Sequence, residues 1–111
     1  TLEMIEDNIA SMVEIAKANN INVVLCSVLP AYDYPWKSGL QPAEKIVALN
    51  KWIKDYSEKN KIIYADFFTP MADERNGLKK EYSEDGVHPN KDGYDVMTPL
   101  VEKAIAESLN H

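Results

Sequence analysis

Residues 21–28 read I-N-V-V-L-C-S-V, an almost unbroken run of β-branched and apolar residues. Runs of this kind, without a polar residue at every second position, are typical of strands buried on both faces of a parallel sheet. Residues 62–66, I-I-Y-A-D, form a second and shorter run of the same character. The two runs therefore predict two buried parallel strands in an α/β protein.

Around these strands lie three segments with apolar residues at helical spacing, which predict helices over about residues 2–18, 42–59 and 91–108. Thr1 and Asn90 are suitable N-caps for the first and last helices, and Pro42 suits the first position of the middle one. We expect the inner face of the last helix to carry Tyr94, Met97, Val101, Ala104 and Ile105. A short helix is predicted around residues 70–75, before a turn at 76–77.

The predicted order is α-β-α-β-α, in which a strand–helix–strand unit favours a parallel pair. In sheets of this type the functional loops follow the carboxyl ends of the strands, so the loops after Val28 and Asp66 should share one rim. Two strands are too few for such a sheet. We therefore expect residues 1–111 to be the C-terminal part of a single larger α/β domain whose N-terminal part is absent.

Composition limits the partners of the chain. Its net charge of −6 disfavours nucleic acid and anionic membrane surfaces, which attract basic proteins. The sequence has no apolar run long enough to span a membrane, and it indicates no compartment. The single cysteine, Cys26, cannot form an internal disulfide and is interpreted as a small buried apolar residue.

The loop before the last helix reads D-G-V-H-P-N over residues 85–90. It contains His88, one of two histidines, the other being the terminal His111. Asp85 can accept a hydrogen bond from one nitrogen of the His88 ring, which fixes the tautomer and leaves the other nitrogen free to act as a base. The alternative is that Asp85 binds backbone amides of the loop while His88 packs beside the start of the helix.

The segment Y-S-E-D-G-V-H-P-N-K-D-G-Y, residues 82–94, resembles the last motif of the SGNH (GDSL-type) hydrolases. That motif is D-x-x-H-P followed by a glycine and an aromatic residue. The segments I-N-V-V-L-C-S-V-L-P at 21–30, L-N-x-W-I at 49–53 and I-Y-A-D at 63–66 also fit this family. The resemblance implies the C-terminal portion of a flavodoxin-like three-layer α/β/α sandwich. It also implies that His88 is the catalytic base and Asp85 its orienting carboxylate.

The activity that the resemblance implies is serine-dependent hydrolysis of a small carboxylic ester, without a cofactor or a metal. The serine of the G-D-S block, the oxyanion-hole glycine and the G-x-N-D asparagine have no match in this sequence. The chain should therefore supply only the His–Asp part of the triad and be inactive by itself. Acetylated sugars, short acyl esters and lysophospholipids remain open as substrates.

Three aromatic residues follow the first strand: Tyr32, Tyr34 and Trp36. They either form a wall over the acyl or alcohol group of the substrate or pack within their own loop. Asp33 and Asp66 are carboxylates near strand ends, but no other ligand residue lies at a suitable spacing, so no metal site is predicted.

Two other interpretations compete with an esterase fragment. One is a non-catalytic α/β half-domain that forms a homo-oligomer through its exposed strand edges. The other is a complete small flavodoxin-like binding domain. The strand count and the lack of a glycine-rich phosphate loop both disfavour this second alternative.

Overall fold

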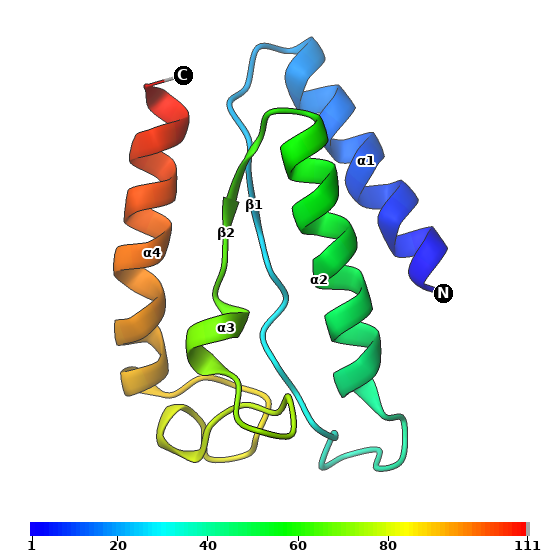
Figure 1. The fold of residues 1–111 in the computed structure, drawn as a ribbon, viewed down its shortest axis with the longest axis vertical. Helices are drawn as coiled ribbons and strands as arrows, with labels where there is room; N and C mark the ends of the chain where they lie inside the picture. The colour runs from blue at the N-terminus through cyan, green and yellow to red at the C-terminus, as the bar shows by residue number, and fades with distance from the viewer. Residues whose placement is uncertain (111) are drawn as a thin grey trace.

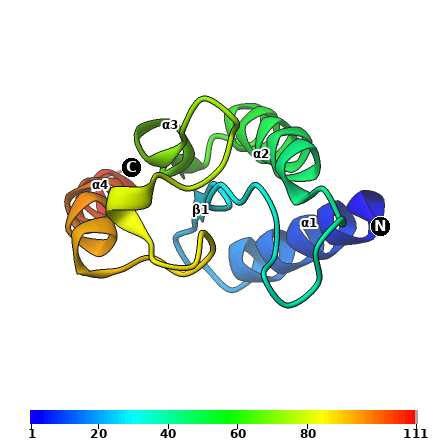
Figure 2. The same ribbon diagram turned by 90° about the horizontal axis from the view of Figure 1, so that it is seen from below.

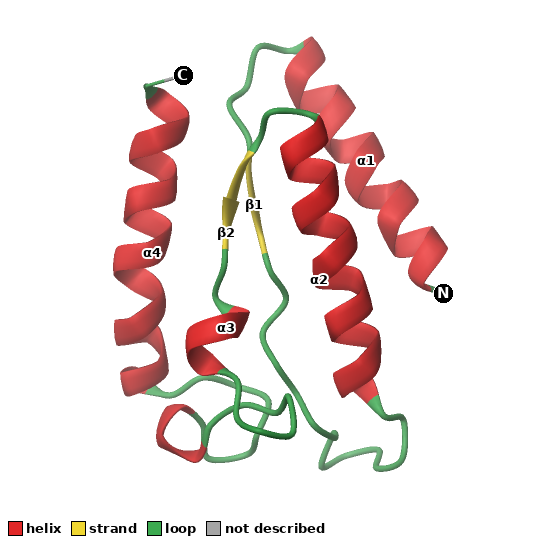
Figure 3. Cartoon of the chain, viewed as in Figure 1, coloured by secondary structure: helices red, strands yellow, loops and turns green. Residues whose placement is uncertain are grey.

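A computed structural model of the protein describes residues 1–110, and His111 lies outside the described residues. In chain order the elements (Figures 1 and 3) are α1 (Leu2–Ala18), β1 (Val24–Cys26), α2 (Pro42–Lys59), β2 (Ile63–Ala65), α3 (Phe68–Met71), the 3₁₀ helix η1 (Lys80–Tyr82) and α4 (Lys91–Leu109). The predicted order of the three long helices and two strands is confirmed. The two short helices lie between β2 and α4.

The two strands pair in parallel, with Val24 opposite Ile63 and Cys26 opposite Ala65. α2 carries the chain from the end of β1 back to the start of β2, so that both strands run in the same direction. The loops that follow their carboxyl ends lie together at one end of the molecule, as the lower part of Figure 1 shows. We call this end the loop rim, and define it as residues 27–41 and 66–90.

The strand pair lies between α2 and α4, and α1 packs against α2 (Figures 1 and 2). The core cluster forms where β2, α3 and α4 meet, and its buried members are Ala65, Phe67, Met71, Leu78 and Ala104. The fold class is thus α/β with parallel strands, as the sequence predicts. Within residues 1–110, no helix is both long and apolar enough to cross a membrane.

The strands are shorter and less buried than the sequence predicts. Pairing covers three residues in each strand rather than residues 21–28 and 62–66. The β1 residues are half-buried, and Ile21 is 59% exposed. The reason is that, among the described residues, each strand has a single neighbour, so a long apolar run finds little backbone to pair with.

Because the strand pair is narrow, the prediction for the inner face of α4 is wrong at two residues. Tyr94 and Ile105 were expected on its inner face, yet they are 55% and 47% exposed. Met97, Val101 and Ala104 do pack in or against the core cluster. Two strands and the short helices cover only part of the apolar stripe of α4, so its edges remain open to solvent.

The short helix expected at residues 70–75 instead occupies Phe68–Met71. It ends because Ala72 is extended and forms an antiparallel bridge with Leu78. Asp73 then closes a turn by accepting hydrogen bonds from the backbone N–H groups that follow it. A side-chain-capped turn competes locally with helix, as is common for aspartate.

Two buried polar side chains hold the strand ends in place. The Asn50 amide of α2 accepts from the Val28 N–H at 2.7 Å and donates to the Val28 carbonyl at 2.9 Å. The Ser27 hydroxyl accepts from the backbone N–H groups of Phe67 and Phe68 at 2.9 and 3.0 Å. These contacts join the loop after β1 to both α2 and the loop after β2.

We predict that Asn50→Ala lowers the free energy of unfolding by about 1–3 kcal/mol, because it leaves both backbone groups of Val28 without a partner. Urea unfolding followed by circular dichroism measures this change. Lys51→Ala is the matched control, because its exposed side chain pairs with Asp55 on the same helix and such surface pairs contribute about 1 kcal/mol or less. Equal effects of the two substitutions would contradict the role given to Asn50.

Candidate active site

The segment between η1 and α4 is a closed loop on the rim. Ser83 and Pro89 form an antiparallel bridge across its base, and the Asn90 N–H donates to the Tyr82 carbonyl at 2.8 Å. At its tip Gly86 has a φ of +82°, a left-handed conformation that glycine adopts without steric cost. The Asn90 side chain then caps α4, so the loop is fixed at both ends.

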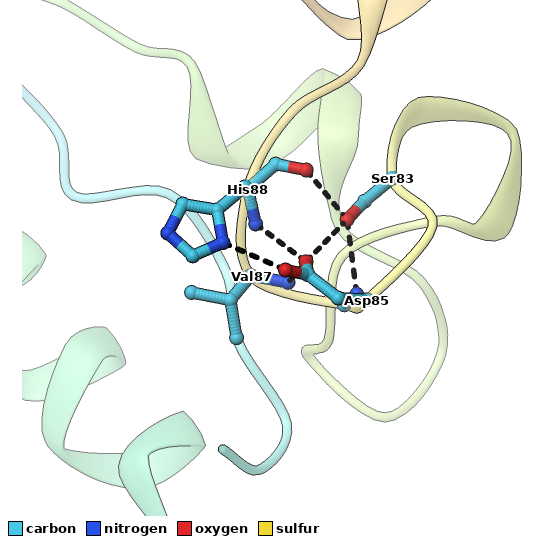
Figure 4. A network of polar contacts seen from close by, with 5 residues as sticks. Ser83, Asp85, Val87 and His88 are labelled. Carbon is cyan, nitrogen blue, oxygen red and sulfur yellow. Dashed lines mark hydrogen bonds and ion pairs between the residues drawn. The ribbon is translucent and has the colours of Figure 1, made fainter. Parts of the chain in front are cut away.

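Asp85 makes both kinds of contact that the sequence left as alternatives (Figure 4). Its Oδ2 lies 2.7 Å from Nδ1 of the His88 ring. Its Oδ1 accepts from the backbone N–H groups of Val87 and His88, each at 2.8 Å. One carboxylate therefore folds the loop and orients the ring, and the free ring nitrogen, Nε2, points away from Asp85 in Figure 4.

Ser83 is a residue whose importance the sequence analysis missed. Its buried hydroxyl donates to the His88 carbonyl at 2.7 Å and accepts from the Gly86 N–H at 2.9 Å. It also lies 3.2 Å from Oδ1 of Asp85. Its spacing, two residues before an aspartate in a turn, is a weak signal for such a role. Because the hydroxyl faces the backbone and the carboxylate rather than the ring, Ser83 is not placed as a nucleophile.

The electrostatics of the pair follow from these contacts. The hydrogen bond from the His88 side chain, followed by those from the backbone N–H groups of His88 and Val87, holds the pKa of Asp85 well below its ordinary value of 3.8. The His88 side chain is 71% exposed and that of Asp85 41%. The carboxylate thus stays ionised near neutral pH, and it favours the histidine tautomer with the proton on Nδ1.

One of the three aromatic residues in the loop after β1, Trp36, lies next to His88, and a second, Tyr34, stacks on Trp36. The rings of Tyr34 and Trp36 are stacked, with centroids 5.3 Å apart and planes 17° apart. The Trp36 ring is 5.8 Å from that of His88. Tyr32 packs elsewhere on the rim, where the Arg75 guanidinium lies 4.2 Å above its ring. Trp36 is thus the residue of the three that reaches the histidine, and Tyr34 supports it by stacking on it.

The two other carboxylates considered at strand ends have structural partners. Asp33 accepts from the backbone N–H groups of Tyr34 and Gly39, which closes the aromatic loop. Asp66 accepts from the N–H and the hydroxyl of Thr69, at the start of α3. No group of three His, Cys, Asp or Glu side chains in residues 1–110 is arranged to hold a metal ion.

The chain thus has a parallel α/β fold with a His–Asp pair on its loop rim. Comparison with known proteins shows which family it belongs to. Residues 1–96, which include Asp85 and His88, match the model of the GDSL-like Lipase/Acylhydrolase family. The chain belongs to this family. No curated protein sequence matches it.

Solved structures agree with this assignment. A GDSL-like lipase from Bacteroides thetaiotaomicron is 43% identical, with a TM-score of 0.93 over 97% of this chain and 54% of that one. A Bacteroides fragilis protein assigned to the acylhydrolases is 40% identical, with a TM-score of 0.95 over 98% of this chain and 53% of that one. The chain thus spans about half the length of these two relatives. The esterase domain of a zebrafish retrotransposon protein shares the fold alone, at 16% identity and a TM-score of 0.79, over 96% of this chain and 60% of that one.

We predict that a ¹³C NMR titration will give Asp85 a pKa below 3.8 and that His88→Ala will raise it toward that value. A lowered folded-state pKa means that the stability contributed by Asp85 is complete above its unfolded pKa. That contribution is lost as the pH falls through the folded pKa. Lys91→Ala serves as the control, because Lys91 pairs with Asp95. An Asp85 pKa at or above its ordinary value would contradict the geometry.

Proposed function

We propose that the full-length protein hydrolyses a small carboxylic ester with a serine nucleophile, and that residues 1–111 form the C-terminal part of its single SGNH-hydrolase-like domain. The observation that carries this proposal is the 2.7 Å contact between Nδ1 of His88 and Asp85. That contact presents Nε2 of an exposed imidazole on the loop rim. Membership of the GDSL-like family supports acyl-transfer chemistry, for which such a pair is suited.

In the proposed reaction, the serine oxygen attacks the ester carbonyl while Nε2 of His88 accepts the serine proton. The imidazolium then gives that proton to the departing alkoxide, which leaves as the alcohol. Water then attacks the resulting acyl-serine while His88 takes a proton from it; the bond between the acyl carbon and the serine oxygen breaks, His88 returns the proton to that oxygen, and the acid is released. Asp85 stabilises the imidazolium without taking its proton, in keeping with the lowered pKa of the carboxyl.

The nucleophile and the oxyanion donors would come from outside residues 1–111. No serine hydroxyl of the described residues hydrogen-bonds to the His88 ring, and Ser27, Ser57 and Ser83 are buried. The hydroxyls of Ser27 and Ser57 bond to the backbone, as does that of Ser83. The relatives described above are nearly twice as long, which leaves room for these groups. We therefore expect the isolated chain to be inactive.

We assign Tyr34 and Trp36 to the wall beside the scissile ester, because their stack reaches the His88 ring. Tyr32 would contact the substrate further from the reacting bond. The proposed chemistry uses no cofactor and no metal, since a hydroxyl, an imidazole and a carboxylate complete the proton relay.

Turnover of p-nitrophenyl acetate by the full-length protein tests this proposal. His88→Ala should lower kcat by about 10³–10⁶-fold, since the members of a triad act as a unit. Asp85→Asn should lower it by about 10⁴-fold, because the amide favours the wrong histidine tautomer. Lys91→Ala, an exposed neighbour, should leave kcat unchanged, and residues 1–111 alone should show no turnover. Retention of most of the activity by His88→Ala would overturn the proposal.

A second candidate function is a non-catalytic half-domain that associates with its own copy. One observation favours it, namely a row of apolar side chains on and after α1 that are 59–65% exposed: Met4, Met12, Ile15 and Ile21. The row leaves apolar surface in water that a partner would cover. Under the esterase proposal, residues outside this sequence would cover it instead.

For the isolated residues 1–111 we predict concentration-dependent self-association in analytical ultracentrifugation. The double variant Met12→Glu/Ile15→Lys should weaken it, whereas Glu3→Gln, on the same helix, should not. A monomeric wild-type chain at high concentration would contradict the role given to the apolar row. An inactive but oligomeric full-length protein would favour the second candidate over the esterase.

A further inference from the structure

Beside the His88–Asp85 pair, the loop rim contains a hollow of about 290 Å³. Its walls combine aromatic rings with hydrogen-bonding side chains, among them Tyr32, Tyr34, Ser38, Asp73, Arg75 and Asp85. The hollow draws on two stretches that are distant in sequence, residues 32–38 and 73–86, because the parallel strands bring their loops to one rim. It adjoins the proposed catalytic pair through Asp85 itself.

Arg75, the only arginine of the sequence, lines this hollow and lies over the Tyr32 ring. Its guanidinium carbon lies 4.2 Å from the centroid of the Tyr32 ring. The turn that carries it is seated directly on Tyr32, since a Cβ on Gly77 would lie 2.9 Å from the Tyr32 Cβ. Among the hydrogen bonds and ion pairs of residues 1–110, none involves the guanidinium. Its N–H donors are therefore available to a ligand that enters the hollow.

An aromatic platform adjoins the hollow on the side of His88. Tyr34 lines the hollow and is stacked on Trp36, a residue that is 63% exposed. A flat aromatic face that stays in water is suited to contact with a ring that has an apolar face of its own. Asp33 fixes this platform by closing the loop around it.

The charged side chains that line the hollow limit which ligands it can bind. Three carboxylates, those of Asp33, Asp73 and Asp85, face one guanidinium, so a phosphate or carboxylate ligand would be repelled. A ligand cation would compete with the guanidinium that already covers Tyr32. A long alkyl chain would leave these polar groups desolvated and without partners. A neutral ring with several hydroxyls satisfies all of these conditions.

We propose that the hollow binds the alcohol part of the ester and that this alcohol is a carbohydrate ring. The inference rests on the proposed function of His88. The C–H face of the sugar packs on Trp36, its hydroxyls donate to the Asp73 carboxylate, and Arg75 donates to its oxygens. Hydrolysis breaks the acyl C–O bond. Water supplies the hydroxyl of the released acid, and the proton that His88 delivers regenerates the sugar hydroxyl.

The competing occupant is a lipid chain in a second hollow. That hollow, of about 500 Å³, lies between the N-terminal ends of α1 and α2 and shares Tyr34. Its lining is mostly apolar and includes Leu2, Ile5, Val28, Leu40, Ile46 and Leu49. A preference for long acyl esters over sugar esters would point to this groove, so the tests below compare the two.

Binding is measured first, without catalysis. The full-length protein is titrated with methyl glucopyranoside, methyl galactopyranoside and methyl xylopyranoside, and the two tryptophan indole N–H signals are followed by NMR. We expect saturable shifts of Trp36 with at least one glycoside. The Trp52 signal is the internal control, since Trp52 stacks on Tyr56 within α2. If no glycoside shifts Trp36, or if only octanoate does, the sugar subsite is wrong.

Specificity is measured second, as the ratio of kcat/KM for acetylated methyl pyranosides to kcat/KM for p-nitrophenyl octanoate. Arg75→Ala and Trp36→Ala should each lower this ratio by about tenfold or more, because each removes a contact to the sugar. Lys80→Ala, an exposed cation of the same segment outside the hollow, should leave it unchanged. Unchanged ratios in both hollow variants would overturn the proposal.

The two hypotheses fail differently in these experiments. Glycoside binding without any ester turnover would contradict the esterase and leave the sugar subsite standing. Turnover of p-nitrophenyl acetate without glycoside binding would support the esterase and contradict the sugar subsite.

Discussion

The parallel pairing of β1 with β2 is the constraint on which the rest of the structure depends. Because α2 returns the chain to the start of β2, both strands end on the same side, and the loops after them must share one rim. Ser27 ties the end of β1 to the backbone after β2, and Asn50 ties it to α2. Contacts between distant segments follow, such as Trp36 with His88 and Arg75 with Tyr32.

Within the rim, Asp85 has two roles that cannot be separated. Its Oδ1 holds the backbone of the loop and its Oδ2 orients the His88 ring. An asparagine at this position could keep the backbone contacts through its carbonyl oxygen, while its NH₂ group would face Nδ1 of the ring. The loop would then stay folded with the imidazole in the wrong tautomer. Ser83 supports the arrangement by binding the carbonyl of His88, which fixes the ring at its backbone.

The sequence predicted what local signals control. Thr1, Pro42 and Asn90 mark helix starts at the positions that the structure has, because capping and proline geometry act over one turn. The D-x-x-H spacing predicted the Asp85–His88 contact for the same reason. Strand lengths were overestimated, because the extent of pairing depends on neighbouring strands rather than on the run itself.

Contacts set by tertiary structure could not be predicted. The spacing of Tyr34 and Trp36 says nothing of His88, which lies more than fifty residues away in the sequence. The hydrogen bonds of Asn50 to Val28 and the contact of Arg75 with Tyr32 likewise join segments that meet only once the sheet has formed. The short helix before Arg75 was misplaced because the Asp73 turn overrides helical propensity there.

The central claim is that Asp85 holds His88 with its proton on Nδ1 and its Nε2 free to act as a base. The most direct measurement is a long-range ¹H–¹⁵N NMR spectrum of the neutral His88 imidazole, which identifies the protonated nitrogen. The account predicts a proton on Nδ1 and a bare Nε2. A neutral ring protonated on Nε2, with Nδ1 bare, would contradict it.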